Sequence, residues 1–290
     1  MQVKKAVILA AGFGTRMLPA TKSLPKEMLP VVDKPVIQYI VEEAVRSGAE
    51  DILIITNRGK SAIEDHFDRS PELENRLHNS GNTEALNGII GIANLANITY
   101  IRQKETKGLG HAVHCAKNFV GNEPFFVLYG DDVIISDNPV CAQLAAAYSE
   151  YNLPVVGIKE VSDESIAKYS SMKLDVLHDN IYRISDMIEK PAPGFAFSNF
   201  SILGRCLLTP DIFPILEAAA PGAGGEIQLT DAIAEIARRS GVIGVDFDGV
   251  RYDMGDKLGI LKAIVELGLI HPVIGKEFAE YLQKRDNGTI

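Results

Sequence analysis

Residues 10–35 read AAGFGTRMLPATKSLPKEMLPVVDKP, and the rest of the chain is organised around this stretch. It directly follows VKKAVIL (residues 3–9), a brief run that ends in apolar residues before the first glycine. Such a run predicts a buried strand rather than a helix. A helical pattern begins near Val36, so we expect the loop between them to leave the carboxyl end of a strand. Open α/β sheets bind ligands at that edge.

The loop combines glycines with cations. Gly12 and Gly14 permit positive φ and let backbone N–H groups approach a bound group closely. Arg16, Lys22 and Lys26 then place three positive charges in a chain whose formal net charge is −9. This local excess favours an anionic ligand such as a nucleotide phosphate. By itself, Gly-x-Gly is equally typical of a tight turn with solvated basic side chains.

Two common nucleotide motifs are absent from the loop. The dinucleotide pattern G-x-G-x-x-G fails because Met17 occupies the third glycine position, and the phosphate-binding pattern G-x-x-x-x-G-K-[S/T] does not occur. An NAD or FAD site of the usual type is therefore disfavoured.

Composition limits the class of protein. The 290 residues are 46% hydrophobic and uniform in composition, so we expect a single domain over residues 1–290. The acidic balance argues against a nucleic-acid partner. Three widely spaced cysteines without a Cys/His cluster indicate reduced thiols. The apolar start is cut short by Gly12, and no apolar run approaches the roughly 20 residues of a membrane span. We expect a cytoplasmic protein with no membrane partner.

Strand and helix patterns alternate along the first half of the chain. Strands are expected at 51–56, 97–102 and 124–129, and helices at 61–67 and 140–151, with a polar surface insertion at 71–96. This order predicts an α/β fold with a Rossmann-like, mostly parallel sheet flanked by helices. A hairpin at 172–177 and 181–188 adds a small antiparallel portion, and amphipathic helices follow at 256–269 and 276–284.

Two acids end the most apolar strand. Gly130-Asp131-Asp132 follows residues 124–129, which are apolar on both faces and therefore central in the sheet. Two adjacent carboxylates repel each other unless a cation lies nearby, and Mg²⁺ prefers such oxygen ligands. An Asp-rich turn is the alternative. Asp131 is the first candidate ligand, because Asp132 points to the other side of an extended strand.

Taken as longer units, these motifs are specific. The motifs span nearly the whole chain. They are AAGFGTRMLP with PKEMLPVVDKPVIQY, KGLGHA at Lys107, GDD at Gly130, EKP at Glu189, SN at Ser198, EIQLTDA at Glu226 and DMGDKLG at Asp253. Together they resemble the nucleotidyltransferases that make nucleotide sugars. Within that group, the chain is similar to the bacterial UTP–glucose-1-phosphate uridylyltransferases, also called UDP-glucose pyrophosphorylases.

The resemblance implies a set of site residues. It places Arg16 and Lys26 on the triphosphate and Lys190 on the sugar phosphate. It implies a Mg²⁺ ion held by Asp131 and Asp253, and a uracil edge read by Gln103, whose amide offers a donor and an acceptor. The implied nucleotide contacts are Ala10, Ala11, Gly12, Gly14, Thr15, Glu27, Gln103 and Gly108. The implied sugar contacts are Asp132, Glu189 and Asn199, with Glu226 nearby.

The implied activity joins UTP and glucose 1-phosphate to give UDP-glucose and pyrophosphate, in a homodimer or homotetramer. Three alternatives stay open from the sequence: a thymidylyltransferase, a non-catalytic nucleotide-sugar sensor and, more remotely, a dehydrogenase. One local departure is visible, because Ser170 follows Tyr169 where the family usually has glycine. That substitution puts the local backbone contact to the sugar in doubt.

Overall fold

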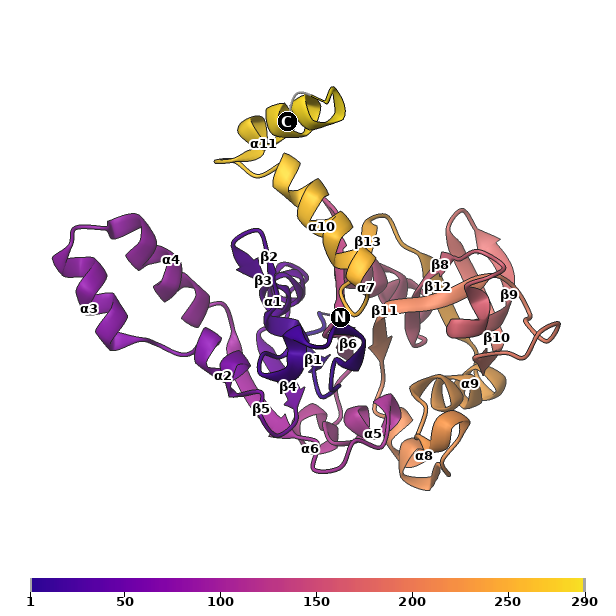
Figure 1. Cartoon of the computed structure of the whole chain (residues 1–290). Coiled ribbons are helices and arrows are strands. Elements are labelled where there is room, and N and C mark those ends of the chain that lie inside the picture. Colours follow the sequence, from indigo (N-terminus) through magenta and orange to yellow (C-terminus); the bar gives the residue numbers. More distant parts are fainter. Residues whose placement is uncertain (1, 289–290) are drawn as a thin grey trace.

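A nine-stranded sheet forms the centre of the protein. The computed structural model describes residues 2–288, apart from the side chain of Ala223. The strand order is β5-β4-β1-β6-β11-β8-β12-β10-β9, and β10 and β11 run against the direction of the others (Figure 1). The strands of this sheet are β1 (Lys5–Leu9), β4 (Asp51–Thr56), β5 (Asn97–Arg102), β6 (Phe125–Tyr129), β8 (Val155–Glu160), β9 (Ser170–His178), β10 (Ile181–Glu189), β11 (Phe200–Leu208) and β12 (Val242–Asp246). The predicted α/β class with a mostly parallel sheet is confirmed.

Helices cover both faces of the sheet, and two smaller ribbons complete it. Alternate residues of β1 belong to two separate buried clusters, Ala6 and Ile8 to one and Val7 and Leu9 to the other. A strand that is buried on both faces is therefore apolar throughout. The helices are α1 (Val36–Arg46), α2 (Ser61–Phe67), α3 (Pro71–Asn79), α4 (Thr83–Ala93), α5 (Leu109–His114), α6 (Lys117–Val120), α7 (Val140–Tyr151), α8 (Ile212–Ala218), α9 (Leu229–Arg239), α10 (Lys257–Leu269) and α11 (Gly275–Asp286). The two ribbons are β2 (Pro30–Val31) with β3 (Lys34–Pro35), and β7 (Asp132–Ile135) with β13 (Val250–Asp253). Short 3₁₀ helices occur at Thr15–Met17, Ala20–Lys22, Lys26–Met28, Ile166–Lys168 and Ala223–Gly225.

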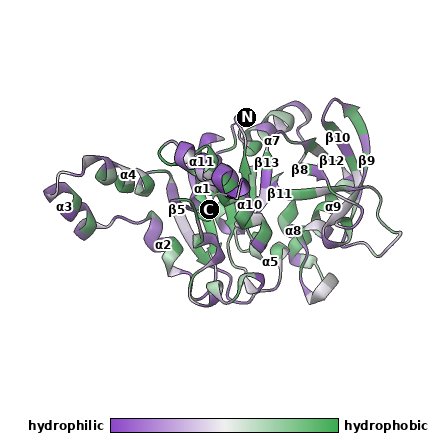
Figure 2. Cartoon of the chain, turned by 45° about the horizontal axis from the view of Figure 1, so that its top comes forward, coloured by the Kyte–Doolittle hydropathy of each residue, from purple (hydrophilic) through white to green (hydrophobic). Residues whose placement is uncertain are grey.

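The polar insertion at 71–96 is a pair of helices that stands away from the sheet (Figure 1). None of the described residues of α3 or α4 is buried. The two helices pack mainly on each other, so this part of the chain adds surface rather than core. By contrast, Figure 2 shows mostly hydrophobic residues along β11, in the middle of the sheet.

The loops that carry the sequence motifs leave neighbouring strands at one edge of the sheet. The N–H of Ala10 donates to the carbonyl oxygen of Ile55 at 2.9 Å, and the N–H of Gly130 donates to that of Leu9 at 3.0 Å. The N–H of Gln103 donates to the carbonyl oxygen of Thr56 at 2.8 Å. A Cβ on Gly130 would lie 2.6 Å from the Leu9 oxygen, so only glycine allows this close approach. The first loop thus leaves the carboxyl end of β1, as predicted, and the segments after β4, β5 and β6 lie beside it.

The strand β11 is the largest departure from the sequence prediction. No strand was expected over these residues, yet β11 lies antiparallel between β6 and β8 and is almost entirely buried. The segment after Gly108 forms two short helices, α5 and α6. Among residues 2–288, no helix is long and apolar enough to cross a membrane.

Candidate active site

Two acids that are far apart in the sequence meet at the tip of β6. Asp131 follows β6, and Asp253 ends β13, which pairs with β7 so that Asp253 lies opposite Asp132. The N–H of Met254 also donates to the Asp131 carbonyl oxygen at 2.8 Å. A Cβ on Gly255 would lie 3.0 Å from Asp131 Oδ2 and 3.1 Å from Asp253 Oδ1. Arg16 Nη2 lies 2.5 Å from the same point, so the two carboxylates and the Arg16 guanidinium converge beside Gly255, where a side chain would collide with all three.

Two cations of the first loop reach the same place. Lys26 Nζ donates to Asp131 Oδ2, and Arg16 Nη1 lies 3.7 Å from Asp253 Oδ2. Burial alone would lower the pKa of Lys26, but Asp131 and Glu27 raise it above its ordinary value. Burial alone would raise the pKa of Asp131, but the Lys26 ammonium holds it below its ordinary value. Lys26 and Asp131 are therefore both charged at neutral pH.

The carboxylate pair fits a magnesium ion. Mg²⁺ is commonly bound by one or two carboxylates, with water and substrate phosphates completing an octahedron. Asp131 and Asp253 provide such a pair, and the side chains of Lys26 and Arg16 lie against it. No group of three or more His, Cys, Asp or Glu side chains that could hold a metal occurs among residues 2–288. Two carboxylates would supply only part of an octahedral coordination shell.

Asp132 faces the interior, unlike Asp131. It is 3% exposed, and its Oδ1 lies 2.5 Å from Arg251 Nη2. Burial raises the pKa of Asp132 to about 6; Arg251 opposes this shift, and Asp131 and Asp253 add to it. A Cβ on Gly204 would lie 2.7 Å from Asp132 Oδ2. These contacts connect Asp132 to Arg251 and β11, and its predicted contact with the sugar stays a prediction.

Glu27 is enclosed beneath the first loop. Its side chain is 0% exposed, and both of its oxygens accept from Lys60 Nζ at 2.8 Å. Lys60 also donates to the carbonyl oxygen of Ala10, and Asn57 Nδ2 donates to that of Ala11, each at 2.5 Å. Burial raises the pKa of Glu27 and lowers that of Lys60, while their mutual attraction opposes both shifts. Glu27 thus contacts a residue that supports the nucleotide loop, and its predicted direct contact with the nucleotide stays untested.

The remaining loop residues surround Lys26. A Cβ on Gly12 would lie 3.6 Å from Lys26 Nζ, and one on Gly14 would lie 3.3 Å from Lys26 Cβ. Gly14 has φ 67°, and its carbonyl oxygen accepts from Thr21 Oγ1 at 2.7 Å. Thr15 begins the 3₁₀ helix that carries Arg16. The loop is therefore folded back on itself above the lysine.

A second group of residues lies at the end of β5. Gln103 is 5% exposed, and its Nε2 donates to the Gly108 carbonyl oxygen at 3.1 Å and to His111 Nδ1 at 2.8 Å. Gly108 has φ 96°, and a Cβ there would lie 2.7 Å from the Ile227 carbonyl oxygen. The segment that holds Gln103 is thus tightly packed and requires glycine.

The residues predicted for the sugar lie on the antiparallel part of the sheet. Glu189 Oε2 accepts from Thr230 Oγ1 at 2.8 Å, and burial raises the pKa of Glu189. Lys190 follows β10 with an exposed side chain and φ 47°. Asn199 Nδ2 donates to Asp163 Oδ1 at 2.5 Å.

Tyr129 ends β6, and burial raises its pKa well above the ordinary value, with smaller contributions from Cys206, Glu189, Asp132 and Asp131.

Ser170 uses its hydroxyl group within the protein. Its Oγ lies 3.1 Å from Ser201 Oγ and accepts from the N–H of Ile202 at 3.2 Å. These bonds join the start of β9 to β11, so the serine at the usual glycine position is accommodated by an inward hydrogen bond.

Four residues near these groups had no role in the sequence analysis: Lys60, His111, Thr230 and Arg251. His111 and Thr230 lie inside quoted motifs, which was a usable signal. Lys60 and Arg251 lie in short polar segments of the sequence, and only the fold shows that each contacts a buried carboxylate.

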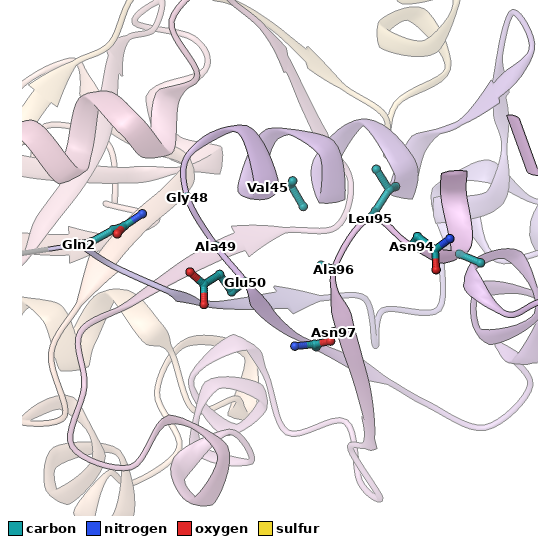
Figure 3. A pocket seen from close by; sticks show the side chains of 10 residues that line it. Gln2, Val45, Gly48, Ala49, Glu50, Asn94, Leu95, Ala96 and Asn97 are labelled. Atoms are coloured by element: carbon teal, nitrogen blue, oxygen red, sulfur yellow. The ribbon is translucent and has the colours of Figure 1, made fainter. Parts of the chain in front are cut away.

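A cavity of about 540 Å³ lies elsewhere, between the end of α1 and the segment that leads into β5 (Figure 3). Gln2, Glu50 and Asn97 are among the residues that line it. Asp51 and Asn97 are the first residues of β4 and β5, so this cavity is at the opposite edge of the sheet from Asp131. It contributes nothing to the site described above.

The fold and the site define an α/β protein whose carboxyl-edge loops gather cations and acids for phosphate-bearing ligands. The Nucleotidyl transferase family matches residues 5–268, and the chain belongs to this family. It is 52% identical, over 97% of its length and 95% of the relative's, to the UTP–glucose-1-phosphate uridylyltransferase YngB of Bacillus subtilis (strain 168).

Two solved structures are also similar. One is a UDP-glucose pyrophosphorylase complexed with UDP-glucose, with a TM-score of 0.82 and 44% identity over 90% of this chain and 97% of that one. The other is the UTP-bound enzyme from Acinetobacter baumannii, with a TM-score of 0.89 and 37% identity over 97% of this chain and 99% of that one. The resemblance predicted from the motifs is confirmed.

Proposed function

We propose that this protein transfers the uridylyl group of UTP to glucose 1-phosphate, giving UDP-glucose and pyrophosphate. The observation that carries the proposal is the meeting of Arg16, Lys26, Asp131 and Asp253 at one strand tip. It occurs in a chain about half identical to enzymes named for this reaction.

The reaction needs positioning and charge neutralisation more than acid–base chemistry. A phosphate oxygen of glucose 1-phosphate attacks the α-phosphorus of UTP, and the bond to the departing pyrophosphate breaks. Because the nucleophile is already an anion, no general base is required. Holding the two groups in line can contribute roughly 7–11 kcal/mol. Fixed positive charges aimed at the phosphates supply the remaining stabilisation.

Each charged group has a proposed task. Lys26 and Arg16 bind the triphosphate of UTP, and Lys190 binds the phosphate of the sugar. Asp131 and Asp253 would hold a Mg²⁺ ion, which supplies further neutralisation of phosphate charge when it is bound. The loop that contacts the nucleotide contains Ala10, Ala11, Gly12, Gly14 and Thr15.

The other contacts concern the base and the sugar. Gln103 and Gly108 face the base, and Glu189, Asn199 and Asp132 act at the sugar side. We further propose that residues 1–290 act as one nucleotidyltransferase domain in a cytoplasmic homodimer or homotetramer.

A substrate panel tests the proposal. Purified protein is incubated with each of UTP, dTTP, CTP and GTP against glucose 1-phosphate and galactose 1-phosphate, with Mg²⁺, and pyrophosphate release is measured. We expect the highest kcat/KM for UTP with glucose 1-phosphate. The base of dTTP differs from that of UTP by one methyl group, which gives only about 1–3 kcal/mol of discrimination. A higher kcat/KM for dTTP would identify a thymidylyltransferase instead, and no pyrophosphate from any pair would contradict catalysis altogether.

A further inference from the structure

Both hydrogens of the Gln103 amide are already occupied within the protein. A glutamine side chain has two N–H donors and one carbonyl acceptor. In this structure Nε2 donates to the Gly108 carbonyl oxygen at 3.1 Å and to His111 Nδ1 at 2.8 Å. A carbonyl oxygen can only accept, so the first contact fixes Nε2 as the nitrogen end of the amide. The second contact then requires His111 Nδ1 to carry no hydrogen.

The amide therefore offers a ligand only its carbonyl oxygen, and not the donor and acceptor together that were predicted from the sequence. Within the described residues 2–288, no hydrogen bond to Gln103 Oε1 is present. Rotating the amide by half a turn would place Oε1 against the Gly108 oxygen, acceptor against acceptor. Gly108 cannot easily move away, because the N–H of Gly110 donates to the Ile227 carbonyl oxygen at 2.9 Å and the N–H of Ile227 to that of Lys107 at 2.8 Å. The orientation of the amide is thus set by its neighbours before any base is bound.

His111 is suited to act as the acceptor. It lies in α5, and a neutral imidazole with its hydrogen on Nε2 leaves a lone pair on Nδ1. Burial lowers the pKa of His111 below its ordinary value, Lys107 and His114 lower it further, and Glu105 opposes them. The neutral form is therefore favoured at neutral pH.

We propose that His111 is a positioning residue that determines base specificity, because it holds the Gln103 amide with its carbonyl oxygen toward the nucleotide base. This inference rests on the proposed function. Uracil carries a hydrogen at N3 that can donate to Gln103 Oε1, whereas cytosine has a lone pair at N3 and would repel it. Thymine carries the same N3 hydrogen as uracil. The His111–Gln103 pair therefore selects UTP over CTP but does not separate UTP from dTTP.

The test compares three nucleotides in four proteins. kcat/KM for UTP, CTP and dTTP is measured for the wild type and for His111→Leu, His111→Gln and His114→Leu. In His111→Leu the amide is free to turn, so we expect the UTP/CTP ratio to fall on the order of tenfold or more. The UTP/dTTP ratio should stay within about twofold. His111→Gln again offers an acceptor and should keep most of the UTP/CTP ratio, and His114→Leu alters the same helix without contacting Gln103.

Several results would overturn the inference. An unchanged UTP/CTP ratio in His111→Leu, or an equal change in both ratios, would show that His111 has no role in reading the base. The wild-type protein provides a second measurement that does not depend on folding of the variants. Long-range ¹⁵N NMR of the histidines should show His111 Nδ1 without a hydrogen when UTP is bound, and a hydrogen on Nδ1 would contradict the proposal. Failure of uridylyl transfer by the wild type would refute the proposed function instead. Calorimetry would then still measure the ratio of the binding affinities for UTP and CTP in each variant.

Discussion

Removing one partner of the buried ion pair between Arg205 and Glu43 is expected to destabilise the protein strongly. Arg205 lies in β11 with its side chain 0% exposed, and Glu43 lies in α1 with its side chain 7% exposed. Arg205 Nε donates to both Glu43 oxygens at 3.0 and 3.1 Å, and Nη2 donates to Oε2 at 2.6 Å. Two further bonds reach the carbonyl oxygens of Gly204 at 3.0 Å and Asp132 at 2.8 Å. The guanidinium thus joins α1 and β11 to the backbone of Asp132, next to Asp131.

The perturbation is Glu43→Gln, which removes the negative charge but keeps the volume and one oxygen acceptor. It leaves a buried guanidinium without a counterion, a change that costs about 3–5 kcal/mol in comparable buried pairs. Total stability is typically about 5–15 kcal/mol, so the loss is a large fraction of it. The double variant Glu43→Leu with Arg205→Met removes both charges, and we expect it to recover most of the loss.

Unfolding in urea, followed by far-ultraviolet circular dichroism because the chain has no tryptophan, measures these differences. The matched control is Glu50→Gln, which removes the same charge from an exposed pair with Lys4 and should cost less than about 1 kcal/mol. If Glu43→Gln were no more destabilising than Glu50→Gln, the buried pair would not have the role assigned to it. A double variant as unstable as Glu43→Gln would also refute the reasoning, because the unpaired charge would then not be the cause.

Two further predictions concern the site itself. Lys26→Ala and Asp131→Ala should each lower kcat about 10²–10³-fold at saturating Mg²⁺, because each variant lacks one charged group that acts on the reacting phosphates. The thermal unfolding midpoint should stay near that of the wild type. Near-normal pyrophosphate release by either variant would contradict these roles. Asp132 has its pKa raised from 3.8 to about 6, so the folded protein binds more protons than the unfolded chain between these values, and stability falls as pH rises through that interval. The unfolding free energy of the wild type minus that of Asp132→Asn should therefore decrease by about 2 kcal/mol from pH 4 to pH 6 in urea titrations, and a pH-independent difference would show that the shift is absent.

Local patterns were sufficient for the regular elements of the first half. The expected bounds 51–56, 61–67, 97–102 and 140–151 coincide with β4, α2, β5 and α7. In each case a short apolar run or a helical repeat of apolar residues is bounded by glycine, proline or a polar residue. The local sequence is therefore sufficient to predict where the element begins and ends. The same reasoning located the glycine loops and Asp131 at one edge, because the carboxyl ends of parallel strands meet there.

The strand β11 could not be predicted in this way, and Arg205 explains why. Residues 200–208 read FSILGRCLL, and the Gly204-Arg205 pair divides them into two apolar pieces, each too short to indicate a central strand. A charge in a fully buried strand is tolerated only when it is paired and hydrogen-bonded. Its partner Glu43 lies 162 positions away in the chain, so no local pattern shows the compensation. The same limit applies to Lys60, whose partner Glu27 is visible only in the folded protein.

The charges around the acidic tip also explain why the proposed function needs a divalent ion. The tip contains as many acids as cations, namely Asp131, Asp132 and Asp253 with Arg16, Lys26 and Arg251. A phosphate placed about 4 Å from one unneutralised carboxylate would be repelled by about 4 kcal/mol per pair of charges near a protein surface. Lys26 prevents this repulsion as long as it contacts Asp131, but it cannot then give its full charge to the phosphate. Under the proposed function, Asp131 and Asp253 would hold the divalent cation, which would supply the positive charge that offsets Asp131, and Lys26 would bind the triphosphate.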